Sequence, residues 1–360
     1  MRAEFAYFAH MKTPVSDSFD DMRGPYDRDG AQEDLWFLPA ITDDVPDFLP
    51  PGPQQHPTEA SVLDDWTQAE ACNAARLARV AGRLGALDER LKRGPEGWRQ
   101  RLALLEAVEL SWTNGPRVAP DRLALWVALR VAGVQDDAQA LARLGWVVRR
   151  LGGGPGPDAG LADFLGRHDA SAAGDMSEPF GDRAAAWHDL MQSGAHLHPI
   201  SRACMGFHLW ALAGLEHQGG ALEAAVTAAR IAASDTDGAV FAPLAMGGAS
   251  ALRAHGPPEA RLKRWCDGMS AAVLTALRHL DQIDAWTLRA DAAMAPLSGR
   301  TPPALRAALT NWPLVSAPMA ESLTGASRAA VQRNLAWMEA KGLIREMTGQ
   351  GRFRMWRAAV

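Results

Sequence analysis

The order of local signals between Ser316 and Trp356 constrains the fold of this chain more than any other feature of its sequence. Ser316 can accept hydrogen bonds from the free amides of a helix's first turn, and Pro318 suits a helix start because its missing N–H costs nothing there. Gly325 can take a positive φ and therefore favours a tight turn. Ser327 can cap a second helix that follows at once. These signals predict two short helices joined by a tight turn.

The second of these helices is predicted to bury one face and to expose another. Its apolar residues recur at spacings of four and three and so share one stripe: Val331, Leu335 and Met338. Its early exposed positions carry Arg328, Gln332 and Arg333. Such side chains can hydrogen-bond guanine or adenine edges in a major groove, or the flanking phosphates. This helix is therefore the candidate reading helix.

A β-hairpin is predicted after the second helix. Gly342 ends the helix in the manner of a left-handed cap, and strands are expected at 344–347 and 352–356 around a turn at 348–351. Phe353 and Met355 alternate with Arg352, Arg354 and Trp356, so one face would pack on the helices and the other would present guanidinium groups to phosphate. Helix, turn, helix and hairpin in this order predict a winged helix-turn-helix that binds double-stranded DNA.

The candidate DNA-binding residues are Ser327, Arg328, Gln332, Arg333, Arg345, Arg352, Arg354 and Arg357. The distribution of charge agrees with this interpretation. Residues 301–360 carry 8 Lys+Arg and 3 Asp+Glu, a net of +5, whereas the other 300 residues carry 29 and 39, a net of −10. An acidic body with one basic end fits a protein that contacts phosphate through that end alone. The alternative is a small helical module with a hairpin that serves protein contacts.

Length and composition favour a reduced, cytoplasmic protein of two or three domains. The chain has 360 residues, of which 48% are apolar. No secretory signal is expected, and the most apolar stretch, 203–215, contains His208 and is too short to span a bilayer. Cys72, Cys204 and Cys266 are isolated and lack the spacings of a zinc site or a disulfide framework. No membrane partner is expected.

Ahead of the basic end the sequence predicts an acidic arm and a helical body, so the expected fold class is mainly α. Residues 1–57 are rich in Pro and hold 4 Lys+Arg against 11 Asp+Glu, which predicts an extended or partly disordered arm with apolar islands that could dock on the body. Residues 58–298 are rich in Ala and Arg, which favours helix. Helices are predicted near 59–91, 96–112, 121–131, 136–151, 182–193, 199–217 and 221–233. The Gly- and Pro-rich stretch 152–157 is either a surface loop or a domain boundary.

A long helix is predicted over 259–295. Its apolar residues are three or four apart and share one stripe: Leu262, Trp265, Met269, Ala272, Ala276, Leu280, Ile283 and Trp286. The stripe could form the seam of a homodimer, which would bring two DNA-binding ends together, or face the core of a monomeric helix bundle. Both interpretations stay open at this point. Pro296 to Pro303 separate this helix from the C-terminal domain, 301–360.

The body offers weak candidates for chemistry. His196 and His198 suggest a metal, together with His188, His208 and His217 nearby, but no Asp or Glu stands at helical spacing to complete a site and no HExxH pattern is present. The carboxylates considered for acid–base pairs are expected on helix surfaces: Asp64, Asp65, Glu89 and Glu106. The Gly-rich stretches lack the Lys-Ser/Thr of a phosphate loop. The sequence therefore predicts no metal, no cofactor and no catalytic residue.

Several short segments resemble a known family. They are Ala86–Leu91, Gly97–Leu102, His198-Pro199 leading into Phe207–Trp210, and Ser298–Pro303 before the helix-turn-helix. Together they resemble a family of uncharacterised alphaproteobacterial proteins that pair an α-helical domain of unknown function with a C-terminal helix-turn-helix domain. The resemblance covers the chain from about Leu35 to its end, and it implies a DNA-binding transcriptional regulator.

A fainter similarity, carried by the Leu-Asp-Glu-Arg segment and His198-Pro199, is to Fic-domain proteins. That resemblance implies a nucleotidyltransferase with His198 as general base, or an inactive relative acting as a scaffold. A Fic enzyme also needs Pro-Phe after the His, an acidic metal ligand and a Gly-Asn-Gly-Arg anion cradle. Here Ile200 to Gly206 supply neither the acid nor the cradle, so nothing there would hold magnesium and phosphate. Nucleotidyl transfer is therefore the alternative to DNA binding, and the expectation is that the protein is not an enzyme.

Overall fold

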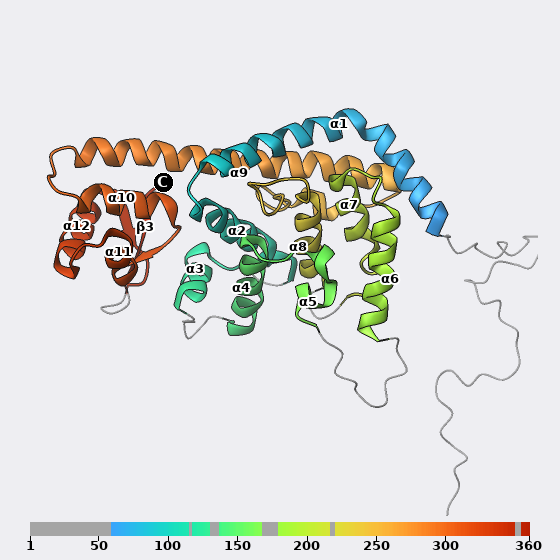
Figure 1. Ribbon diagram of the computed structural model, residues 1–360, viewed down its shortest axis with the longest axis horizontal. Helices are drawn as coiled ribbons and strands as arrows, with labels where there is room; N and C mark the ends of the chain where they lie inside the picture. The colour runs from blue at the N-terminus through green and yellow to red at the C-terminus, as the bar shows by residue number, and fades with distance from the viewer. Residues whose placement is uncertain (1–58, 115–116, 130–136, 168–178, 217–219, 350–353) are drawn as a thin grey trace, which may run out of the picture. The chain divides into compact units, whose positions relative to one another are not determined.

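The computed structural model describes residues 59–114, 117–129, 137–167, 179–216, 220–349 and 354–360. All of these residues lie in the second of the two units into which the chain divides, 57–360. The predicted acidic arm, 1–57, lies outside the described residues. Within the described part of the second unit, helices predominate and the strands form one small sheet (Figure 1). The fold is mainly α, as the composition predicted.

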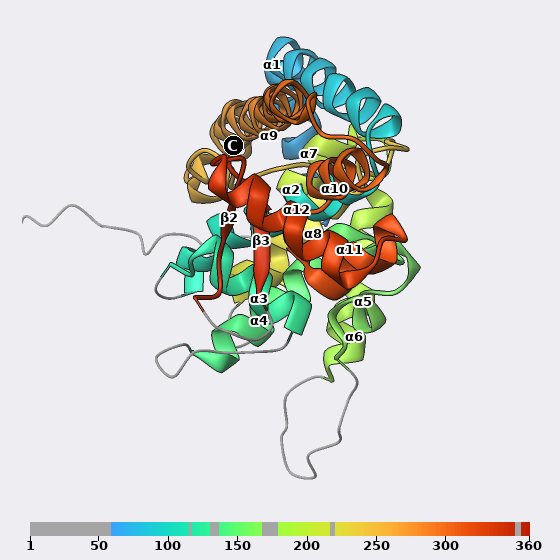
Figure 2. The same cartoon turned by 90° about the vertical axis from the view of Figure 1, so that its left-hand side faces the viewer.

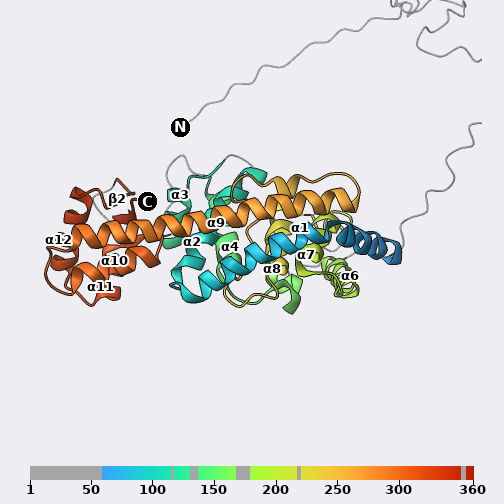
Figure 3. The same ribbon diagram turned by 90° about the horizontal axis from the view of Figure 1, so that it is seen from above.

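Two long helices pack side by side: α1, Glu59–Arg93, and α9, Pro258–Met294 (Figures 1 and 3). Arg90 of α1 bridges Asp281 and Asp284 of α9 at 2.8 and 2.7 Å. The predicted helix 259–295 is confirmed, and every residue of its apolar stripe is fully buried within this chain. The stripe therefore packs in the protein's own core, and its interpretation as a seam between two copies is wrong.

Shorter helices complete the body. They are α2 Gly97–Leu110, α3 Pro120–Leu129, α4 Ala138–Gly152, α5 Leu161–Leu165, α6 Phe180–Ser193, α7 Pro199–Leu209 and α8 Gly220–Ala232, with 3-10 turns η1 Ser111–Asn114, η2 Pro157–Ala159 and η3 Ser250–Arg253. Most match the predicted ranges within a few residues. The helix predicted over 199–217 ends at Leu209, because the chain turns back through Gly214 at φ 65°. Helix α5 was not predicted.

The Gly-rich stretch after α4 is a loop inside one core. Arg230 of α8 donates hydrogen bonds to the carbonyl oxygens of Arg150, Gly153 and Gly154 at 2.5 to 3.1 Å. Leu144 before the stretch and Leu161 after it belong to the same hydrophobic cluster. The two helical groups on either side of the stretch are therefore packed together.

The described part of the C-terminal region contains six elements: α10 Thr301–Asn311, β1 Val315–Ser316, α11 Ala317–Thr324, α12 Arg328–Ala340, β2 Ile344–Glu346 and β3 Met355–Ala358. The strands form an antiparallel sheet in the order β1-β3-β2. The strand predicted at 352–356 is instead β3, which begins at Met355 and reaches Ala358. Strand β1 was not predicted; it pairs Val315 with Trp356.

The described residues form two hydrophobic clusters, and α9 contributes to both. The first fills the body. The second contains Trp286, Ala290 and Met294 of α9, together with Leu305, Leu309, Val315, Ala320, Val331, Leu335, Met338, Leu343, Ile344, Trp356 and Ala358. The sheet lies between the clusters, since Met355 belongs to the first and Trp356 to the second. Both faces of β3 are therefore covered.

Candidate nucleic-acid interface

The predicted helix ends are confirmed at atomic detail. The hydroxyl of Ser316 accepts a hydrogen bond from the amide of Met319 at 3.2 Å. The hydroxyl of Ser327 accepts one from Ala330 at 3.4 Å and so caps α12. Gly325 and Gly342 have φ values of 62° and 68°, the left-handed region that favours glycine. The caps and glycines therefore define where α11 ends and where α12 begins, and a short turn joins the two helices (Figure 2).

Helix α12 buries one face and exposes the other. Val331, Leu335 and Met338 are buried in the second cluster. Arg328, Gln332 and Arg333 are exposed. Two further exposed positions of this face carry short side chains: Ala329, next to Arg328, and Ala336, about one turn after Gln332 and Arg333. The outer face of α12 therefore combines short alanine side chains with two guanidinium groups and one amide.

Four basic groups of this region make no ion pair among the described residues: Arg328, Arg333, Lys341 and Arg345. Two of the three carboxylates in 301–360 are already engaged. Glu339 pairs with Arg354 at 3.2 Å. Glu346 accepts hydrogen bonds from the hydroxyl and amide of Thr348 and from the amide of Gly349; burial opposes its charge, but these bonds lower its pKa. The free charge around α12 is therefore positive.

The hairpin departs from the prediction at Trp356, and its described arginines lie on both faces of the sheet. Trp356 was expected to point outward beside Arg354, but it is buried and its indole donates to Glu339. Arg354 stacks over Trp356 at 5.0 Å and pairs with Glu339, so it lies on the α12 side of the sheet. Because side chains alternate along a strand, Arg357 shares its face with Met355, which packs on the body.

Arg345 stands directly opposite Arg357 in the sheet and shares that body-facing side. Arg357 pairs with Asp121 of α3 at 3.4 Å. The structure therefore brings Ser327, Arg328, Gln332, Arg333 and Arg354 to the α12 side and sets Arg345 and Arg357 apart from them. Arg352 lies outside the described residues.

The body holds this region by hydrogen bonds that sequence reasoning missed. One nitrogen of the Arg101 guanidinium donates to the carbonyls of Leu309, Thr310 and Trp312 at 3.0, 3.3 and 2.7 Å. These carbonyls lie at the C-terminal end of α10, where helix acceptors are unpaired and a cation is favoured. Burial lowers the pKa of Arg101 to about 10. Arginine is usually exposed, so nothing in the local pattern marked this residue as buried.

Three of the histidines considered for a metal site make contacts within the body instead. Nδ1 of His198 accepts a hydrogen bond from the amide of Ile200 at 3.1 Å and caps α7, and burial lowers the pKa of its ring. His208 stacks against Trp66, and burial lowers its pKa to about 4. Nε2 of His196 lies 3.0 Å from the hydroxyl of Thr67. Among the residues that the structure describes, no three His, Cys, Asp or Glu side chains gather in a way that could hold a metal ion.

One expected surface carboxylate is deeply buried. Glu106 is fully buried and accepts hydrogen bonds from the amides of Leu244, Ala245 and Met246 at 2.8, 2.8 and 3.0 Å. Burial raises its pKa to about 7 although these bonds oppose the shift. The placement of Glu106 on a helix surface was wrong, because the 239–246 segment folds over α2. Asp64, Asp65 and Glu89 are exposed as expected.

Comparison with models of known protein families gave no match, and a search of curated proteins also found none. The resemblance to the alphaproteobacterial family stays a prediction. None of the described helices combines the length and apolar character needed to cross a membrane.

Proposed function

We propose that residues 301–360 are a winged helix-turn-helix domain that binds double-stranded DNA, and that the protein is a sequence-specific transcriptional regulator. The observation that carries the proposal is the outer face of α12. It is capped by Ser327, exposed along its length and bordered by Arg328 and Arg333, which have no acidic partner among the described residues.

The proposed reading helix is α12. An α-helix of this width fits the major groove of B-form DNA, where arginine pairs with guanine and glutamine with adenine. The alanines at 329 and 336 allow close approach, so Arg328, Gln332 and Arg333 can reach base edges. Arg354, beside the helix, is the proposed phosphate contact.

The arrangement of the strands supports the same proposal. Strand β1 precedes α11, and β2 and β3 follow α12, so a three-stranded sheet backs the two helices. In this proposal the hairpin follows the DNA backbone next to the groove that α12 enters.

The test is a fluorescence anisotropy titration of the full-length protein with duplex DNA. The duplex is selected from genomic fragments by repeated rounds of capture on the protein. Arg328→Ala and Arg333→Ala should each weaken binding by about 1–3 kcal/mol and relax sequence preference. Arg264→Ala is the matched control, because it removes one exposed arginine of α9 in the body that makes no ion pair within the described part of the chain.

Affinity for the selected duplex should be unchanged in the control. If the two α12 variants bind it as tightly as the wild-type protein does, the proposal fails. If no duplex is enriched above random fragments, sequence-specific binding is ruled out.

A further inference from the structure

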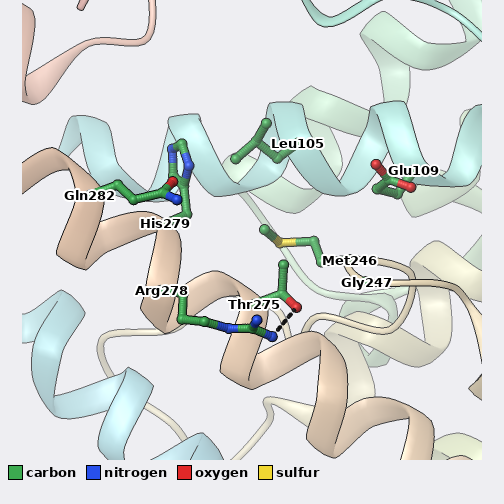
Figure 4. Close-up of a pocket in the computed structure, with 8 residues that line it drawn as sticks. All are labelled: Leu105, Glu109, Met246, Gly247, Thr275, Arg278, His279 and Gln282. Atoms are coloured by element: carbon green, nitrogen blue, oxygen red, sulfur yellow. Dashed lines mark hydrogen bonds between the residues drawn. The ribbon is translucent and has the colours of Figure 1, made fainter. Parts of the chain in front are cut away.

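A pocket of about 270 Å³ lies between α2, the segment around Met246 and α9 (Figure 4). Leu105 of α2 and Met246 form its apolar part. Thr275, Arg278, His279 and Gln282 of α9 form its polar part. Gly247 lines one side of the pocket and has a φ of 87°. A Cβ atom at this position would come within 2.7 Å of the hydroxyl of Thr275. The absence of a side chain at Gly247 keeps this part of the pocket open.

We propose that this pocket binds a small organic molecule carrying one carboxylate group. The anion would bind to Arg278, whose side chain is exposed and makes no ion pair among the described residues. Its guanidinium is already oriented, because Nε donates to the carbonyl of Leu274 at 3.2 Å and one terminal nitrogen donates to the hydroxyl of Thr275 at 3.1 Å. The remaining N–H groups fit the planar, two-point geometry of a carboxylate.

Another pocket residue, His279, has a ring nitrogen without a hydrogen-bond partner in the described chain. Nε2 of His279 is buried and has none among the described residues. Buried polar atoms are nearly always paired, so an unpaired one that lines a pocket calls for a ligand or water. The amide of Gln282 lies beside the ring (Figure 4). Together these two side chains can bind a further polar atom of the ligand.

The charges around the pocket favour one carboxylate over a phosphate. Glu109 lines the pocket from α2 and is paired with Arg117. Arg278 is then the one lining cation, in the described chain, that lacks an acidic partner. A dianion would place a second negative charge near Glu109, and among the residues that line the pocket only Arg278 carries a full positive charge to balance it. Leu105 and Met246 favour a ligand with an apolar portion.

The two helices that line the pocket, α2 and α9, also carry residues that hydrogen-bond the C-terminal region. Arg101, one turn before Leu105 on α2, donates to the end of α10. Trp286, one turn after Gln282 on α9, donates to Leu343 before β2. A ligand that changes the spacing of α2 and α9 would shift both anchors, and so would alter DNA affinity. This coupling rests on the proposed function, whereas the pocket itself does not.

The test is calorimetric titration of the full-length protein with benzoate and 4-methylpentanoate. Benzamide and inorganic phosphate are the comparison probes, since the first lacks the charge and the second carries more of it. The carboxylates should bind more tightly than either. Arg278→Ala should weaken their binding about 10- to 100-fold, the loss of a charge-assisted hydrogen-bonded pair. Arg264→Ala, on the same helix outside the pocket, should leave binding unchanged.

The proposal is overturned if neither carboxylate binds, if phosphate binds as tightly, or if Arg278→Ala binds like the wild-type protein. Repeating the DNA titration with saturating carboxylate tests the coupling. A shift in DNA affinity that disappears in Arg278→Ala supports it, and an unchanged affinity overturns the coupling alone. If the carboxylate binds but no duplex does, the DNA-binding proposal has failed and the pocket stands.

Discussion

Trp286 of α9 donates its indole N–H to the carbonyl oxygen of Leu343 at 2.7 Å, and both residues are buried. This bond joins the long helix of the body to the segment between α12 and β2. Because Trp286 also lies in the second hydrophobic cluster, α9 is part of the C-terminal core as well as of the body. The orientation of α12 on the protein is therefore fixed by packing rather than by a tether.

Two substitutions of Trp286 should separate the contribution of its hydrogen bond to stability from the contribution of its packing. Trp286→Phe leaves the carbonyl of Leu343 without its donor and should lower the free energy of unfolding by about 1–3 kcal/mol. Trp286→Ala also opens a cavity and should cost about 3–5 kcal/mol. Urea denaturation measures both. Trp312→Phe is the control, because the indole N–H of Trp312 has no partner in the described residues. Equal losses for Trp286→Phe and Trp286→Ala would contradict this division.

Substitutions of basic residues on the two faces of the sheet should differ in their effect on DNA affinity. Arg357 is paired with Asp121 and faces the body, so Arg357→Ala should change affinity little. Arg354→Ala, on the α12 side, should weaken binding and reduce the dependence of affinity on salt concentration. Titrations at two or more salt concentrations measure both effects. A larger loss for Arg357→Ala than for Arg354→Ala would show that the body-facing side contacts DNA.

A negative charge on the outer face of α12 should abolish DNA binding without affecting the fold. Ala336 is exposed, so Ala336→Glu should be tolerated in the free protein, as helical circular dichroism and thermal melting would show. Close to phosphate the same charge repels. Ala75→Glu, at an exposed position of α1, is the matched control for net charge. Unchanged affinity in Ala336→Glu would remove α12 from the interface.

Glu106 should give stability a measurable pH dependence. Burial raises its folded pKa from the ordinary 4.5 to about 7, so its contribution is complete below pH 4.5 and is lost as the pH rises through 7. Burial lowers the pKa values of His208 and His279 to about 4, and their contributions are lost in the opposite direction, as the pH falls from 6.5 towards 4. The wild-type curve therefore combines opposing slopes.

Comparing wild-type protein with Glu106→Gln isolates the glutamate. Between pH 4.5 and 7 the wild-type protein should lose stability relative to the variant, by at most about 1.4 kcal/mol per pH unit for one proton. Denaturant unfolding at several pH values measures the difference. Asp64→Asn, which removes an exposed carboxylate of α1, controls for the change in net charge. Parallel curves for the wild-type protein and Glu106→Gln would refute the prediction.

Local sequence signals determined much of the C-terminal region. Ser316, Gly325, Ser327 and Gly342 specify their own backbone geometry through one hydrogen bond or one φ angle, so their roles could be predicted without the fold. The exposure of Arg328, Gln332 and Arg333 followed from the 3.6-residue period that buries Val331 and Leu335. The length of α9 followed from the same periodicity.

Tertiary structure alone decided which surfaces meet. The stripe of α9 suits a second chain or the protein's own core equally well, and only the packing of α1, α7 and the C-terminal region against α9 chose the core. A strand of alternating residues does not reveal that both of its faces are covered, so Trp356 was predicted to point outward although it is buried. Burial of Arg101 and Glu106 depends on carbonyls and amides about 140 to 210 residues away in the chain. Hydrophobic periodicity shows which face of a segment is buried, but it does not show which distant segment covers that face.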